Sequence, residues 1–263
     1  MEIPNTLCSN VYDFAFCPEP CYDRLVDLAD PEDWGPGNRI LKNYLSFSFS
    51  RAVYLTERDV DQTAPSNLPL VFDDDRCLFN TGLYTRRYET IYGLFEPNTK
   101  PDARQRWFLK GFFFKESDPM LVSFEYLPCR VRFAEDPSEL VFDYRLPIRS
   151  NIDHILGDEE NLTRIPASLM GEGNSLLLRR AFEGAVVEAA RRAAANYTLA
   201  VPQFYGGRIQ LLLPLCLTGD KPELALTIQR EDGFYAARTC LTLDIAYNNA
   251  RLICRPETSW IKR

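Results

Sequence analysis

One long amphipathic helix, followed by three strand-like segments, constrains the fold of this chain more than any other feature. The segment "NSLLLRRAFEGAVVEAARRAAANY" begins with an Asn174/Ser175 cap, and Glu188 and Arg192 form a favourable i,i+4 pair on its polar face. Pro202 prevents the helix from running further. Its apolar side fits a single helical stripe made of Leu178, Phe182, Ala185, Ala189 and Ala193.

The strand-like segments determine the predicted fold class. Three of them, "GRIQLLLPLCLT", "ELALTIQRE" and "FYAARTCLTLD", follow the helix, and Glu231-Asp232-Gly233 makes a hairpin turn between the last two. Earlier in the chain, "LPLVFDDDRCLFNTGLYT" is strand-like and breaks at Asn80-Thr81-Gly82, and "YETIYGLFEPN" and "RWFLKGFFFKES" follow it. We therefore predict an α+β fold, with a mainly antiparallel sheet packed against one long helix (about 175–197) and shorter helices.

The remaining segments are less regular. Residues 1–37 are rich in proline and irregular around one short acidic helical piece, and residues 126–173 predict short helices and extended connections. Residues 38–56 place apolar side chains near helical spacing, but their Ser/Phe alternation also fits a strand. Because no linker-like tract separates the segments, we expect residues 1–263 to form a single compact domain with an irregular N-terminal segment, 1–37.

Charge and composition exclude several classes of function. The formal net charge is −7, which disfavours gripping a long duplex nucleic acid, because such proteins gain affinity from a basic surface. Arginine outnumbers lysine 24 to 6, and arginine recognises phosphate or carboxylate in a planar, bidentate way. A coding sequence rich in GC explains the same excess equally well.

The sequence also indicates a compartment. No apolar run is long enough to span a membrane, and the segment "MEIPNTLCSN" lacks the features of a secretory signal. The eight cysteines are scattered, so we expect reduced thiols in a cytoplasmic protein. Cys17 and Cys21 are the only close pair, and no second pair completes a zinc site with them.

Few sequence features point to a cofactor or a metal. The chain has no Walker A loop, no glycine-rich dinucleotide fingerprint and no G-x-S-x-G elbow. Asp73-Asp74-Asp75 could bind a cation, but consecutive strand residues point to opposite faces, so a solvated loop is the simpler interpretation. We predict neither a cofactor nor a metal.

His154, in "RSNIDHILGDEEN", is the only histidine and therefore the one group that exchanges protons near neutral pH without help. It is a candidate catalytic acid or base, or an imidazolium that contacts phosphate. The alternative is a structural histidine that caps a helix or satisfies a buried carbonyl.

Two glycine-containing stretches are candidate ligand-binding loops. "FNTGL" places Asn80, Thr81 and Gly82 where backbone N–H groups can form an anion-binding nest, although an ordinary turn explains it too. "AVPQFYGGRIQ" brings polar residues to a Gly-Gly bend, for which a simple hairpin is the alternative. Its candidate residues are Gln203, Tyr205, Arg208 and Gln210.

The stretch "TCLTLDIAYNNARLIC" joins a strand to a short helix after Asp244. Tyr247, Asn248, Asn249 and Arg251 on that helix make a set suited to stacking on bases, reading base edges and holding phosphate. The alternative is a buried polar network with an internal Asp244–Arg251 salt bridge. Two consecutive asparagines are unfavourable inside a helix, so their presence suggests a compensating role.

Several of these motifs resemble a bacterial family known as domain of unknown function 3825. They occur in the expected order and cover most of residues 38–260: "FNTGL", "IYGLFEPN", "FAEDPSELVFD", "NIDHIL", "NYTLAVPQFYGGRIQLLLPLCLT" and "RTCLTLDIAYNNARLI". The resemblance implies an association with nucleic-acid-binding modules such as cold-shock-type domains, to which this domain is often joined. It assigns no activity and no catalytic residue.

Three functions follow as expectations. The first is a metal-independent phosphodiesterase or ribonuclease for a short RNA or a small cyclic oligonucleotide, such as an oligoadenylate signal of antiviral defence, as in a ring nuclease. His154 and Arg251 would be catalytic, because RNA cleavage by the adjacent 2′-OH needs only alignment, proton transfer and charge stabilisation. The second is a non-catalytic nucleotide- or RNA-binding module, and the third a structural or interaction protein. The sequence does not determine the oligomeric state, and a homodimer is compatible with it.

Overall fold

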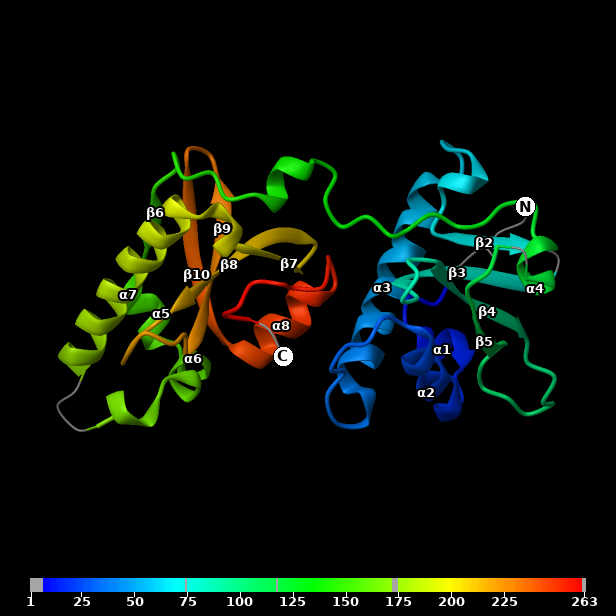
Figure 1. The fold of residues 1–263 in the computed structure, drawn as a ribbon, viewed down its shortest axis with the longest axis horizontal. Coiled ribbons are helices and arrows are strands. Elements are labelled where there is room, and N and C mark those ends of the chain that lie inside the picture. The colour runs from blue at the N-terminus through cyan, green and yellow to red at the C-terminus, as the bar shows by residue number, and fades with distance from the viewer. Residues whose placement is uncertain (1–6, 74, 117, 172–174, 262–263) are drawn as a thin grey trace. The chain divides into compact units, whose positions relative to one another are not determined.

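Residues 7–73, 75–116, 118–171 and 175–261 are described by the computed structural model of this chain, and they fall into two compact units (Figure 1). The first unit comprises Met1–Val131 and the second Arg132–Arg263. The sequence predicted one compact domain, because no linker-like tract separates its segments. Each unit nevertheless has its own sheet and its own buried residues.

The first unit combines helices with one five-stranded sheet. Its helices are α1 (Val11–Phe14), α2 (Glu19–Leu28), α3 (Arg39–Asp59) and α4 (Pro119–Val122), with 3-10 turns η1 (Pro36–Asn38) and η2 (Pro65–Asn67). Its strands are β1 (Ala15–Phe16), β2 (Leu70–Asp73), β3 (Arg76–Tyr84), β4 (Thr90–Pro97) and β5 (Trp107–Phe113). The sheet order is β1-β5-β4-β3-β2, with only the β1–β5 pair parallel.

Helix α3 provides the core of the first unit. Its Phe49 is fully buried, and its ring lies 4.9 Å from that of Phe14, 5.4 Å from Phe79 and 5.7 Å from Phe95. The buried positions of α3 recur at three- and four-residue intervals, from Ile40 to Thr56, as one face of a helix requires. Of the two alternatives for residues 38–56, a helix or a strand, the structure shows the helix that their apolar spacing indicated.

The second unit has a second five-stranded sheet. Its strands are β6 (Ile148–Ser150), β7 (Val201–Tyr205), β8 (Arg208–Leu215), β9 (Leu224–Glu231) and β10 (Phe234–Thr242). Its helices are α5 (Ile152–Gly157), α6 (Glu159–Arg164), α7 (Ser175–Ala195) and α8 (Leu243–Arg251), with 3-10 turns η3 (Pro137–Leu140), η4 (Ala167–Leu169) and η5 (Tyr197–Leu199). The order is β6-β10-β9-β8-β7, and only the β6–β10 pair is parallel.

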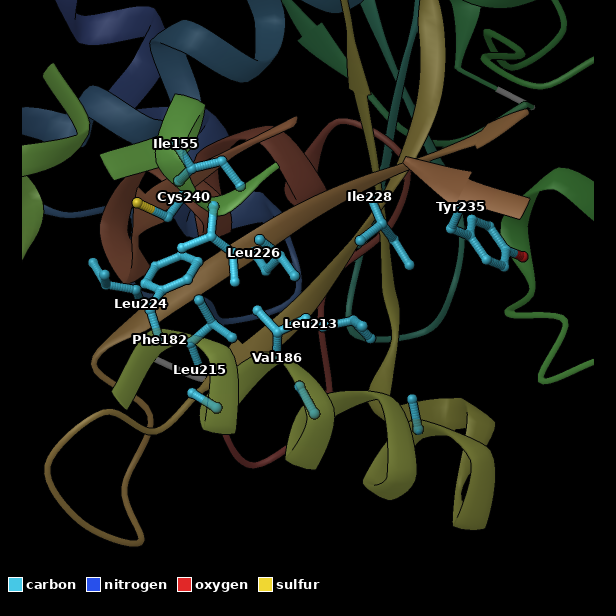
Figure 2. Packing of buried hydrophobic residues seen from close by; sticks show 14 of the residues in the cluster. Ile155, Phe182, Val186, Leu213, Leu215, Leu224, Leu226, Ile228, Tyr235 and Cys240 are labelled. Atoms are coloured by element: carbon cyan, nitrogen blue, oxygen red, sulfur yellow. The ribbon is translucent and has the colours of Figure 1, made fainter. Parts of the chain in front are cut away.

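Helix α7 packs on one face of the second sheet (Figure 2). Its Phe182 is fully buried together with alternate residues of the strands, among them Leu213 of β8 and Leu226 of β9. Five of the buried α7 positions are those of the predicted stripe, and Glu188 lies 3.6 Å from Arg192. The α+β fold with a long helix in this region is confirmed, while Asn174 lies outside the described residues.

Helices α5 and α8 pack on opposite faces of the second sheet. Ile155 of α5 belongs to the same buried cluster as Phe182 of α7. Helix α8 contacts β7, β9 and β10, and its Asn249 bonds to Gln203, whose side chain points away from that cluster. The sheet therefore separates α5 and α7 from α8, as Figure 1 also shows.

Most local predictions hold, with one correction in the first unit. Strands β4, β5, β8, β9 and β10, helix α8 and the turn before Gly233 occupy the predicted segments. The strand containing "FNTGL", however, does not end at residues 80–82: β3 continues to Tyr84 through a register shift against β4. A bulge accommodates the glycine without interrupting the sheet. None of the described helices is long and apolar enough to cross a membrane.

Candidate functional site

The residues predicted from the sequence are divided between the two units. Asn80, Thr81 and Gly82 belong to β3 of the first unit. All the others belong to the second unit, on α5, on the β7–β8 hairpin and on α8.

In the first unit, the "FNTGL" bulge uses its polar groups inside the fold. Asn80 is buried and donates from Nδ2 to the Pro128 carbonyl at 2.9 Å, while its Oδ1 accepts from the Gly82 N–H at 3.0 Å. Thr81 is also buried, and its hydroxyl donates to the Ile91 carbonyl at 2.6 Å and accepts from the Leu83 N–H at 3.1 Å. These bonds satisfy the side chains internally, so they favour a structural role for the bulge.

Gly82 is required by the packing at this bulge. Its φ is +71°, and a Cβ added there would stand 2.6 Å from the Tyr44 hydroxyl and 3.5 Å from Nε of Arg130. The Tyr44 hydroxyl occupies that space because it donates to the Thr81 carbonyl at 2.8 Å. Any other residue would displace this buried hydrogen bond.

In the second unit, three glutamine side chains form a row across the sheet. Gln203 of β7 lies opposite Gln210 of β8, and its Nε2 donates to Gln210 Oε1 at 2.8 Å. Gln210 Nε2 in turn reaches Gln229 Oε1 of β9 at 3.4 Å. We call the sheet face that carries these three side chains the amide face. Alternation along the strands sets it opposite the face covered by α7.

The amide row is anchored at both ends. At one end, Asn249 Nδ2 of α8 donates to Gln203 Oε1 at 3.1 Å. At the other, Gln229 Nε2 donates to Glu231 Oε1 at 3.1 Å, and the same oxygen accepts from Arg238 of β10. Gln203 and Gln229 are buried and each amide of the row is bonded on both sides, so the row is satisfied internally and fixes the strands that carry the exposed groups beside it.

Aromatic and guanidinium groups lie on the same face beside the amide row. Tyr205 is paired with Arg208 across the β7–β8 hairpin, and both are exposed, Tyr205 to 65%. Gly206 and Gly207, with φ of +58° and +79°, form the tight turn that holds this pair together. On the strands beyond Gln229, the Arg149 guanidinium of β6 lies 4.3 Å from the ring centre of Phe234 of β10.

The α8 residues are placed differently from one another. Tyr247 and Arg251 are buried, whereas Asn248 and Asn249 are half-buried. Asn248 Nδ2 donates to the Asp244 carbonyl one turn earlier at 3.0 Å, and its buried Oδ1 has no hydrogen-bond partner within the described residues. Asn249 reaches the amide row through Gln203, so it is a member of "YNNAR" that α8 contributes to this face.

His154 is not part of the amide face. It lies exposed on α5, on the α7 side of the sheet, and its backbone N–H bonds to the Asn151 side chain that caps the helix, at 3.2 Å. Arg251 is on α8, on the opposite side. The structure therefore does not bring together the two residues that the sequence assigned to catalysis.

The thiols and carboxylates do not form a metal centre in the described part of the chain, where no cluster of three His, Cys, Asp or Glu side chains is present. Burial raises the pKa of Cys17 to about 11, and Cys21 is also shifted upward by burial, so both pKa values disfavour the thiolates that a zinc ion requires. Burial likewise raises the pKa of Cys240 to about 11. Of Asp73-Asp74-Asp75, the central residue lies outside the described residues, and Asp73 pairs with Arg76.

Sequence reasoning missed five residues of the amide face: Arg149, Gln229, Glu231, Phe234 and Arg238. Gln229 could have been predicted from the sequence. It is a polar residue at the end of the apolar run "LALTIQ", and strand alternation assigns it to the face opposite Leu226. Arg149 and Phe234 carried none, because their contact depends on the parallel pairing of β6 with β10.

The fold and this face define a two-unit α+β protein with a hydrogen-bonded polar row on one sheet. The sequence model of the family described as "Domain of unknown function (DUF3825)" matches residues 25–260, and the chain belongs to that family. Comparison with curated proteins gives no match, and comparison with solved structures gives none either.

Proposed function

We propose that the second unit binds a nucleotide or a short single-stranded RNA on its amide face. The observation that supports this proposal most directly is the exposed Tyr205–Arg208 pair, which stands beside the hydrogen-bonded row from Gln203 to Gln229. Aromatic rings stack on bases and guanidinium groups bind phosphate, and the internally bonded amide row fixes the strands that carry these exposed groups.

The charge distribution supports a small ligand. The strand residues of the amide face include Arg149, Arg208 and Arg238 but only one acid, Glu231, although the whole chain carries a net charge of −7. A locally cationic face on an acidic protein attracts a short anionic ligand, while the overall charge disfavours a long polymer.

The geometry supports binding more directly than catalysis. A metal-independent phosphodiesterase using His154 and Arg251 would need both on one side of the sheet, and they are on opposite sides. We therefore propose a binding module, in a reducing cytoplasm in which the cysteines stay free. Cleavage of oligoadenylates remains a measurable alternative outcome.

The proposal predicts that Tyr205→Ala and Arg208→Ala each weaken binding of a fluorescently labelled single-stranded RNA about tenfold or more, because each removes a stacking or phosphate contact. Fluorescence anisotropy with linear and cyclic oligoadenylates, in the presence of EDTA, measures the affinity. Gel analysis of the same samples reports cleavage.

A matched control is available on the same strand pair. Arg230 of β9 is the neighbour of Gln229 but points to the other face, 3.9 Å from Asp143. Arg230→Ala and His154→Ala should leave the affinity unchanged. If Arg208→Ala and Arg230→Ala lowered the affinity equally, the loss would come from the change in net charge. The proposal that the amide face binds the ligand would then be wrong.

A further inference from the structure

Two aromatic side chains mark the ends of the amide face. Tyr205 is on β7 and Phe234 on β10, with β8 and β9 between them. Adjacent strands are about 4.8 Å apart, so three strand spacings separate the two rings by roughly 14 Å. A mononucleotide does not reach across that distance. Domains that bind RNA on a sheet face stack about two or three splayed bases over a comparable width.

Both rings offer a platform for a base. Tyr205 is 65% exposed. Phe234 is half-buried, and the guanidinium of the exposed Arg149 lies over its ring, 4.3 Å from the ring centre, so the guanidinium supported by the ring offers the stacking surface. Bases stack on guanidinium planes as well as on rings. The two ends of the face therefore hold similar stacking sites.

Between the two rings, and directly opposite Phe234, Glu231 of β9 carries an oriented hydrogen-bond acceptor. Glu231 Oε1 already accepts from Gln229, at 3.1 Å, and from Arg238. Its second oxygen, Oε2, takes part in no hydrogen bond with the described residues, and the side chain is 31% exposed. Arg238 balances the carboxylate charge, so a phosphate on the neighbouring Arg208 is not repelled by a net negative site.

Resting on the proposed function, we infer that the ligand is a single-stranded RNA segment of about three nucleotides whose middle base carries an exocyclic amino group. The outer bases stack at Tyr205 and at the Arg149–Phe234 pair. The middle base donates from its amino group to Glu231 Oε2, as glutamate does to cytosine. Adenine, cytosine and guanine satisfy this requirement, and uracil, which has no amino group, does not.

A length series tests the spacing of the two stacking sites. Adenosine mono-, di- and trinucleotides are titrated into the full chain by calorimetry, and affinity should rise about tenfold or more when the third nucleotide is added. Phe234→Leu should reduce that step, whereas Arg230→Ala, on the other face of the sheet, should leave the whole series unchanged. A mononucleotide that binds as tightly as the trinucleotide would overturn the inference but not the proposed function.

A base series tests the role of Glu231. Trinucleotides with adenine or cytosine in the middle should bind about tenfold more tightly than one with uracil. Glu231→Gln keeps an acceptor for Gln229 and Arg238 but replaces Oε2 with a donor, so the preference should shift toward uracil, whose carbonyls accept. Thermal unfolding of the variant confirms that it is folded.

The outcomes distinguish whether the chain binds oligonucleotides at all from whether Glu231 selects the middle base. If no oligonucleotide binds at any length, the proposed function fails. If oligonucleotides bind but the wild-type chain and Glu231→Gln rank the three bases identically, the amide face binds without Glu231 reading the middle base, and the inference alone is wrong.

Discussion

At the scale of single residues, the packing around Gly82 explains why this position holds a glycine. Its positive φ and the Tyr44 hydroxyl 2.6 Å from the place of a Cβ both exclude a side chain. Gly82→Ala should therefore lower the free energy of unfolding by at least about 2 kcal/mol, because the backbone strain adds to the loss of a buried hydrogen bond. Urea titration followed by fluorescence measures the change.

Gly37 is the matched control for this prediction. It lies in the same unit with φ of +60°, and a Cβ there would meet no atom within 4 Å. Gly37→Ala should cost about 1 kcal/mol, the strain alone. Equal destabilisation by the two substitutions would show that the contact with Tyr44 contributes nothing.

At the scale of elements, the sequence predicts those whose pattern is local. The stripe of α7, strands β8 to β10 and helix α8 follow from periodicity within one segment. Strand β6 has three residues and pairs in parallel with β10, so no local pattern indicates it. For the candidate site, Gln203 and Gln210 could be predicted from their hairpin. Gln229 joins them only through the register of β8 with β9.

The segment from Phe142 to Arg145 shows how a short connection is attached to the sheet. The Phe142 ring stacks on Tyr235 of β10 at 5.1 Å, and the Asp143 N–H donates to the Tyr235 hydroxyl at 2.9 Å. The Asp143 carboxylate accepts from Arg145 Nε at 2.8 Å and Nη2 at 2.7 Å. These side-chain bonds and the Arg145 backbone N–H lower the pKa of Asp143 to about 2.

This attachment predicts a specific acid dependence. Because the folded-state pKa of Asp143 is lower than its ordinary value, its stabilising effect is complete above about pH 4 and is lost as the pH falls toward 2. Asp143→Asn should lower the midpoint of thermal unfolding at neutral pH and flatten its decline between these two values. Arg145→Ala should do the same. An unchanged acid profile in the Asn variant would exclude Asp143 as a source of the dependence.

At the scale of the whole molecule, the number of sheets is the feature that the sequence did not reveal. Strand-like segments occur both before and after residues 126–173. The composition of these segments does not determine whether they join one sheet or two. The answer lies in strand order, since β1 to β5 pair only with one another and so do β6 to β10. Pairing between distant segments depends on tertiary packing, which periodicity does not encode.

The division into units predicts that residues 132–263 fold as a separate fragment. Their buried cluster, from Phe142 to Cys240, and all five strands of their sheet come from this half alone. A unit with its own core and sheet meets the physical requirements of a domain. The fragment should unfold cooperatively in urea, and Leu226→Ala, which removes a fully buried side chain, should destabilise it by about 2–5 kcal/mol. A fragment without a cooperative transition, or one insensitive to Leu226→Ala, would show that this core does not form on its own.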